Sequence, residues 1–156
     1  MNNLRYRKAF RWPGQVEAFI RSRANGFVIN VCNGESMLGD LRIDRFSDNT
    51  DIRADAGYLP LKGDIADTVI CDPPWELPYH LRGRLVKELR RILKPGGILL
   101  FEAPWSPKQP GLPVEEILVP EYQLMWFRNI ALLWVCRKTR GLLPGFQYPL
   151  PGETED

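Results

Sequence analysis

Residues 67–101 read DTVICDPPWELPYHLRGRLVKELRRILKPGGILLF, and this stretch decides the fold. Asp67 to Cys71 holds an apolar, β-branched run that must end before the double proline, because proline donates no hydrogen bond to a sheet. Leucine and isoleucine recur at helical spacing over 81–93, which predicts a helix with its basic residues on the opposite face. Lys94-Pro95-Gly96-Gly97 ends this helix, and the apolar run Ile98 to Phe101 follows. The order strand, helix, turn and strand predicts parallel neighbouring strands.

The same alternation extends to both sides of this stretch. A short apolar run from Phe27 to Cys32, bounded by Gly26 and Asn33-Gly34, predicts a buried strand. The other predicted elements are a helix over 13–24, strands over 41–46 and 51–55, and a hairpin formed by 122–127 and 130–136. We therefore predict an α/β fold whose sheet is mostly parallel and ends in a C-terminal antiparallel hairpin.

The chain length suits one domain. At 156 residues we expect a single domain over 1–156, with a basic arm at 1–11 and a proline- and glycine-rich tail at 141–156. No apolar run is long enough to cross a membrane, and the three cysteines are widely spaced within apolar runs. We expect a cytoplasmic protein with buried free thiols.

Two connections in the first half of the chain are short. Only Glu35 to Asp40 lie between Gly34 and the next predicted strand, whereas a parallel crossover usually takes a dozen or more residues. Ser47 to Thr50 is also too short to hold a helix. We therefore expect helices to be reduced on one face of the sheet, with the 13–24 helix as its main cover. A homodimer partner, a different partner subunit or the tail is expected to cover the remainder.

Charge is distributed unevenly along the chain. Residues 35–76 hold ten carboxylates against four basic residues, although the net charge of the whole chain is +2. Basic residues gather in the arm, in the 81–93 helix and near residue 138. These clusters indicate either a surface for a polyanion such as nucleic acid or simply solvated helix faces.

Asp72-Pro73-Pro74-Trp75 is the strongest local sign of chemistry, because ligands of parallel sheets bind beyond the carboxyl ends of the strands. Two prolines hold the backbone rigid and place a carboxylate, a carbonyl and an aromatic ring close together. The two oxygens can accept both hydrogens of an exocyclic amine while the ring stacks on a planar acceptor. The structural alternative is a proline turn with a core tryptophan and a helix-capping aspartate.

This tetrapeptide resembles motif IV of the class I S-adenosylmethionine-dependent amino-methyltransferases, which grips the target nitrogen. The similarity extends over about residues 13–137. Residues 28–36 occupy the place of motif I, the glycine-rich loop under the methionine part of the cofactor. Asp44 ends a segment that resembles motif II, whose acid binds the ribose hydroxyls, and Asp55-Ala56 is similar to motif III, which contacts the adenine. The cofactor-binding residues that the resemblance implies are Asn30, Cys32, Asn33, Gly34, Ser36, Asp44, Asp55 and Ala56.

The resemblance also implies a Rossmann-like methyltransferase sheet, S-adenosylmethionine as cofactor, and a reaction that needs no metal. Asp72, Pro73, Pro74 and Trp75 would be the catalytic residues. Motif I departs from its usual pattern of an acid and three glycines, since Asn30 replaces the acid and Cys32 and Ser36 replace the outer glycines.

The tryptophan in the tetrapeptide is similar to that of adenine-N6 enzymes, which implies methylation of adenine N6 in DNA or RNA. Two other functions stay open at this point. One is a protein or small-molecule N-methyltransferase, and the other is a non-catalytic nucleic-acid-binding subunit that keeps the fold. We expect His80 on the surface, and Trp105 either beside the acceptor or in ordinary packing.

Overall fold

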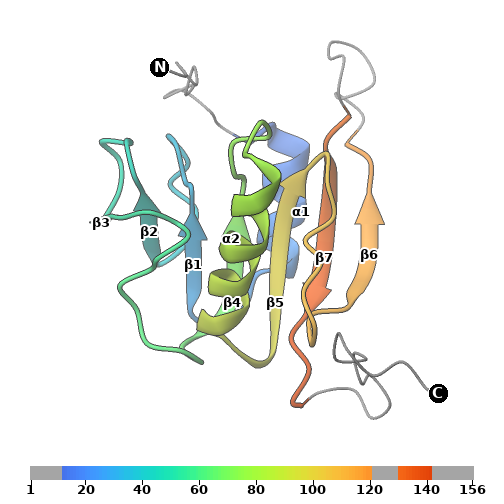
Figure 1. The fold of residues 1–156 in the computed structure, drawn as a ribbon. Helices are drawn as coiled ribbons and strands as arrows, with labels where there is room; N and C mark the ends of the chain where they lie inside the picture. The colour runs from blue at the N-terminus through green and yellow to red at the C-terminus, as the bar shows by residue number, and fades with distance from the viewer. Residues whose placement is uncertain (1–11, 121–129, 142–156) are drawn as a thin grey trace, which may run out of the picture.

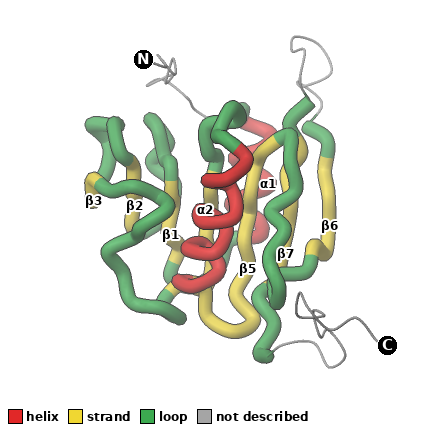
Figure 2. Tube along the Cα trace, in the orientation of Figure 1, coloured by secondary structure: helices red, strands yellow, loops and turns green. Residues whose placement is uncertain are grey.

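The part of the chain that the structure describes forms a seven-stranded sheet with one helix on each face (Figures 1 and 2). The computed structural model describes residues 12–120 and 130–141. The strands lie in the order β3-β2-β1-β4-β5-β7-β6. The elements are α1 (Gly14–Arg23), β1 (Val28–Val31), β2 (Leu41–Asp44), β3 (Ile52–Arg53), β4 (Ala66–Cys71), α2 (Tyr79–Ile92), β5 (Leu93–Ala103), β6 (Val114–Leu118) and β7 (Leu132–Arg137). Neither helix in these two ranges is long and apolar enough to span a membrane.

The sheet confirms the predicted mixture of strand directions. Strands β3, β2, β1, β4 and β5 run parallel, while β7 runs antiparallel to both β5 and β6. The predicted helices and the strands of the parallel half all occur, with ends that differ by a few residues. Helix α2 ends at Ile92, directly before Lys94-Pro95-Gly96-Gly97, as predicted. These four residues fall within the bounds of β5 but bulge out of its pairing with β4, because Leu93 pairs with Ala66 and Ile98 already pairs with Thr68. Gly96 has a positive φ of 85° in this bulge.

The antiparallel end of the sheet contains a strand that the sequence did not predict. Within the described residues β7 pairs with β6 at Val114–Leu118, whereas the predicted partner 122–127 lies outside them. Strand β6 is an edge strand, so its side chains face water and lack a regular apolar alternation. Its glutamates form ion pairs instead, Glu115 with Arg137 and Glu116 with Arg23.

Successive side chains of the central strands point to opposite faces and build two separate cores. On one face Leu99 and Phe101 pack with the buried side of α2, which contributes Leu85, Val86, Leu89 and Ile92. On the other face Ile98 and Leu100 pack with α1 through Val16 and Ile20. Burial of each such side chain stabilises the fold by about 1.5–3 kcal/mol. The two cores hold the strand ends, and therefore the loops beyond them, in fixed positions.

The α1 face of the sheet has few helices, as expected, but its chemistry differs from the expectation. On this face β1 carries Asn30 and β2 carries Arg42, in place of apolar side chains. Asn30 lies buried beneath the β1–β2 loop, whose Leu38 joins the α1 core, and Arg42 forms an ion pair with Asp51. The β1–β2 loop and the Arg42–Asp51 ion pair therefore cover this part of the sheet.

Candidate active site at the carboxyl edge of the sheet

The residues singled out from the sequence follow neighbouring parallel strands. Val31 pairs with Ile43 on one side and with Cys71 on the other, so β1, β2 and β4 end at the same edge. The bend at Gly34, the acid at Asp44 and the tetrapeptide that begins at Asp72 therefore emerge side by side. Asp55 follows β3 at this edge as well. The structure thus brings the predicted cofactor and acceptor residues to one side of the molecule.

The bend after β1 has the backbone conformation of a glycine-rich loop. Cys32 and Gly34 both have positive φ, 58° and 54°, in the left-handed region that favours glycine. Cys32 therefore occupies a position that glycine would accept without strain. The Cys32 thiol lies within hydrogen-bonding contact of the Cys71 thiol. Burial raises the pKa of the Cys71 thiol, and the contact with Cys32 raises it further. The bend and the end of β4 are in direct contact at this point.

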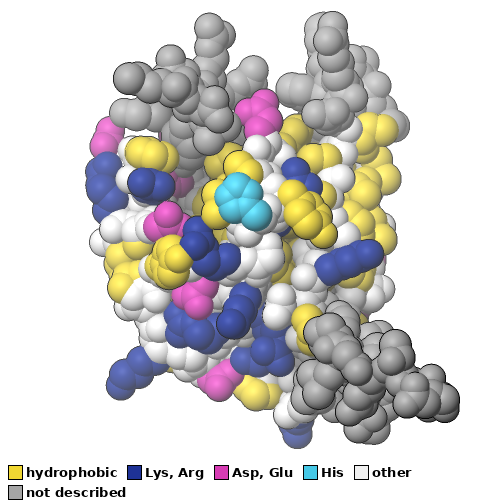
Figure 3. Space-filling view, viewed as in Figure 1, with side chains coloured by type: hydrophobic (Ala, Val, Ile, Leu, Met, Phe, Trp, Pro, Cys, Tyr) yellow, Lys and Arg dark blue, Asp and Glu magenta, His cyan; other side chains and the backbone are white. Residues whose placement is uncertain are grey.

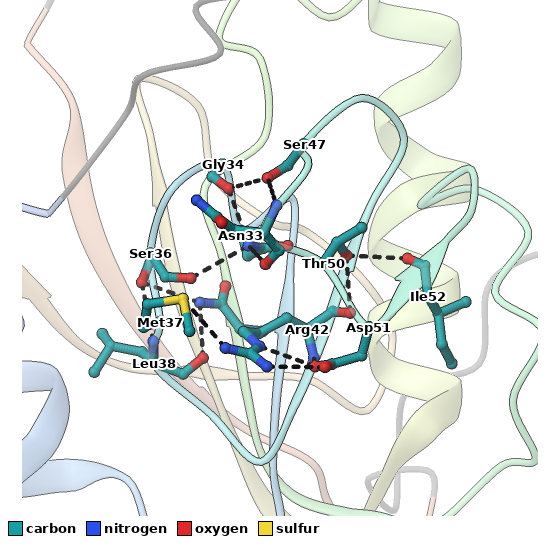
Figure 4. A network of polar contacts seen from close by, with 12 residues as sticks. Asn33, Gly34, Ser36, Met37, Leu38, Arg42, Ser47, Thr50, Asp51 and Ile52 are labelled. Atoms are coloured by element: carbon teal, nitrogen blue, oxygen red, sulfur yellow. Dashed lines mark hydrogen bonds and ion pairs between the residues drawn. The ribbon is translucent and has the colours of Figure 1, made fainter.

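Asp44 holds the loops of this edge together. Its carboxylate accepts hydrogen bonds from the backbone N–H of Gly34 at 3.1 Å, Phe46 at 2.7 Å and Ser47 at 3.0 Å. The Ser47 hydroxyl in turn donates to the Gly34 carbonyl (Figure 4). Asp44 is only 2% exposed, so hydrogen bonds from ribose hydroxyls would come in addition to the three that its carboxylate already accepts.

Two buried asparagine oxygens in the same bend have no partner in the described residues. Asn30 donates through Nδ2 to Ser36 Oγ at 3.3 Å and to the Leu38 carbonyl at 3.2 Å. Asn33, labelled in Figure 4, donates to three backbone carbonyls. The Oδ1 atoms of both side chains are buried and accept no hydrogen bond from the described part of the chain. A buried acceptor without a donor costs about 1–3 kcal/mol, so the bend suits a ligand rich in N–H or O–H groups.

The motif III segment is more open. Asp55 accepts a hydrogen bond from the Gly57 N–H at 2.7 Å and lies 3.5 Å from Arg45, with 47% of its side chain exposed. Ala56 is half-buried against the α2 core. Asp55 is thus the most accessible acid among the predicted cofactor-binding residues.

The tetrapeptide after β4 fixes an acid and an aromatic ring to each other. Trp75 donates from Nε1 to Asp72 Oδ1 at 3.0 Å, and both side chains are half-buried. In the described ranges no second hydrogen bond to the Asp72 carboxyl is found. Pro73 is buried and Pro74 exposed; the Leu77 N–H donates to the Pro74 carbonyl at 2.9 Å, whereas no described residue donates to the Pro73 carbonyl. Among the described residues, one Asp72 oxygen and the Pro73 carbonyl therefore accept no hydrogen bond.

Glu102, which the sequence analysis did not single out, is a second acid close to Asp72. It lies on β5, is fully buried, and faces the same side of the sheet as Leu100. Burial raises the pKa of Asp72 well above its usual range, the charge of Glu102 raises it further, and the Trp75 hydrogen bond opposes both. The sequence does contain a sign of this buried acid, namely a glutamate in an apolar strand next to β4. Such a position keeps a carboxyl group out of water.

Trp105 follows β5, and His80 lies at the start of α2. Trp105 packs edge-to-face on Phe101 at 5.0 Å between ring centroids, with the Arg82 guanidinium 4.8 Å from its own centroid. Its Nε1 is buried without a hydrogen-bond partner in the part of the chain described. His80 is exposed in the first turn of α2, as expected.

Known proteins resemble this chain both in sequence pattern and in fold. A family model described as a methyltransferase domain matches residues 13–101. A putative methyltransferase from Bacillus halodurans superposes with a TM-score of 0.60 at 12% identity, covering 81% of this chain and 99% of that chain. A SAM-dependent methyltransferase from Methanosarcina mazei gives 0.58 at 11%, covering 83% and 99%. TrmN from Thermus thermophilus gives 0.59 at 21%, covering 78% and 47%. No curated protein matches the chain. At these identities the structural likeness shows the fold alone.

Proposed function

The chain belongs to the methyltransferase-domain family and uses S-adenosylmethionine, and from this premise we propose that it methylates an exocyclic amine, the N6 of adenine in nucleic acid. The observation that carries the proposal is the hydrogen bond between Trp75 and Asp72 next to the Gly34 bend. An acid, a carbonyl and a ring held in one place can orient a flat amine, whereas a simple proline turn does not require them at this edge.

The bend after β1 fits the cofactor. When bound, S-adenosylmethionine supplies a methyl group activated by its sulfonium, and it carries an ammonium, two ribose hydroxyls and an adenine amine as donors. The unpartnered oxygens of Asn30 and Asn33 match the donors of the amino acid part. Asp44 at the end of β2 and the open carboxylate of Asp55 would serve the ribose and the adenine, with Cys32, Gly34, Ser36 and Ala56 shaping the loops.

The tetrapeptide fits the acceptor. An exocyclic NH2 has two hydrogens, and the free Asp72 oxygen and the Pro73 carbonyl can accept one each. This pair would fix the amine and direct its lone pair toward the methyl group, while Trp75 contacts the ring. Holding the two reacting atoms about 3–3.5 Å apart supplies a large share of the acceleration in such transfers. The amine proton leaves after attack, and no side chain must first remove it.

A transfer assay with labelled cofactor tests this function. The full chain is incubated with single-stranded RNA, single-stranded DNA, proteins and small amines, and the label is mapped in each fraction. We expect label on adenine N6 in one of the nucleic acids. Label confined to proteins or small amines would replace the proposed acceptor by another class of nitrogen.

A non-catalytic nucleic-acid-binding subunit is the second candidate, because three backbone amides already occupy the Asp44 carboxylate. Calorimetry with S-adenosylmethionine distinguishes the two. Absence of binding at millimolar cofactor, together with retained nucleic-acid binding, would favour the subunit over the enzyme.

A further inference from the structure

The outer side of α2 carries positive charge that carboxylates do not neutralise. Seven described arginines elsewhere or at the end of α2 form ion pairs with carboxylates, namely Arg21, Arg23, Arg42, Arg45, Arg53, Arg91 and Arg137. Arg82 and Arg84, in the first two turns of α2, have no such partner among the described carboxylates. Figure 3 shows basic side chains interleaved with exposed hydrophobic ones on this face. The face is therefore suited to an anion supplied from outside.

These two arginines lie on aromatic rings. Arg82 donates to the Leu77 carbonyl at 2.9 Å and has its guanidinium over Trp105, and Arg84 bonds the Tyr58 hydroxyl with its guanidinium 4.3 Å from that ring centroid. The contacts orient both cations without cancelling their charge. A phosphate would therefore meet guanidinium groups that are already in position.

Two tyrosines beside them are exposed far more than packing would require. Tyr79 is 86% exposed at the start of α2, four residues after Trp75, and Tyr58 is 64% exposed. A tyrosine ring open to water next to a phosphate site can stack on a base without regard to its identity. Bases in a duplex are stacked on each other and cannot use such rings.

We propose that Tyr58, Tyr79, Arg82 and Arg84, here called the α2 track, bind the phosphates and unstacked bases that flank the target in single-stranded nucleic acid. The proposal rests on the proposed function, because Tyr79 of the track follows Trp75 of the proposed acceptor site by only four residues. The four residues combine both recognition elements that a single strand needs, cations for the backbone and rings for the bases.

Fluorescence anisotropy of the full chain with labelled oligonucleotides tests the track. The probes are adenine-containing single strands of RNA and of DNA, and duplexes of the same sequences. We expect single strands to bind at least tenfold more tightly than duplexes, with the RNA and DNA arms identifying the sugar. Tyr79→Ala should weaken binding about tenfold, whereas Tyr79→Phe, which keeps the ring, should not.

Charge variants give an independent readout. Arg84→Glu should weaken binding and make the slope of log K against log salt shallower by roughly 0.7 per lost phosphate contact. Arg21→Glu on α1, on the opposite face of the sheet, is the matched control and should leave binding unchanged. Unchanged binding in both Tyr79→Ala and Arg84→Glu, or equal affinity for duplexes, would overturn the proposal.

Kinetics separate this proposal from the proposed function. In the track variants the KM for an oligonucleotide should rise while kcat and the transfer to free adenosine stay the same. If no acceptor is methylated at all, the proposed function fails, but the anisotropy results still decide whether the track binds single strands.

Discussion

Trp75 Nε1 lies 3.0 Å from Asp72 Oδ1, so the ring and the acid of the proposed acceptor site are joined by a hydrogen bond. Burial and the nearby charge of Glu102 favour the protonated form of Asp72, and the Trp75 N–H favours the ionised form. The acid is thus placed where its protonation state depends on its neighbours. This dependence leads to measurable effects of pH on both activity and stability.

Methyl transfer should increase with pH through the raised pKa of Asp72, because the ionised carboxylate accepts a hydrogen from the amine more strongly than the protonated acid does. Asp72→Asn keeps a carbonyl oxygen but does not ionise. Its reaction should be slower, and its rate should not show this increase with pH. The measurement is kcat/KM of both proteins between about pH 5 and 9. The same limb in the asparagine variant would assign the titration to another group.

Asp72→Asn should also stabilise the fold at neutral pH. A carboxyl group whose pKa is raised on folding stabilises the protein below its unfolded pKa, at about pH 4, and this contribution is lost as pH rises through the folded value. The gain from Asp72→Asn should therefore be small at pH 4 and grow toward pH 8. Urea unfolding of both proteins across this range measures it. A gain that shrinks with rising pH would mean that the folded pKa of Asp72 is not raised.

Cys32→Gly should be more stable than Cys32→Ala by roughly 1 kcal/mol. A side chain with positive φ costs about 1–2 kcal/mol, which glycine avoids, and the extra flexibility of unfolded glycine offsets about 0.5–1 kcal/mol of that gain. At a strand position with negative φ the alanine variant would be the more stable of the two. The difference in stability therefore tests the backbone conformation at the bend. Chemical denaturation of the two variants gives the difference.

Asn30→Asp, which restores the acid of the usual motif I, should destabilise the protein by about 1–3 kcal/mol. The Asn30 amide donates to the Leu38 carbonyl and the Ser36 hydroxyl inside a buried loop, and a carboxylate there would lose the donor and face a carbonyl oxygen. Asn33→Asp is a matched comparison in the same bend, since Asn33 also donates to backbone carbonyls. A stabilised Asn30→Asp protein would show that the bend rearranges freely.

The sequence predicts well those features that depend on short-range patterns. The apolar run before Pro73 and the helical spacing over 81–93 determine β4 and α2, and their order predicts the parallel sheet. Edge strand β6 was missed because two adjacent glutamates interrupt its apolar alternation and find arginines far away in the chain.

The candidate site also has features that the sequence predicts and features that it does not. The residues that follow β1, β2 and β4 could be placed at one edge from the sequence, since parallel strands end together. The bonds of Asp44 could not, because they depend on loops whose course has no periodic signal. The proximity of Glu102 to Asp72 depends on the pairing of β4 with β5 and on which face each side chain takes.

The most direct test of the account measures cofactor binding and methyl transfer together in Asp72→Ala. Asp72 would grip the acceptor while the Gly34 bend holds the cofactor, so the variant should bind S-adenosylmethionine with unchanged affinity by calorimetry and transfer no labelled methyl to adenine. Full transfer by Asp72→Ala would contradict the account.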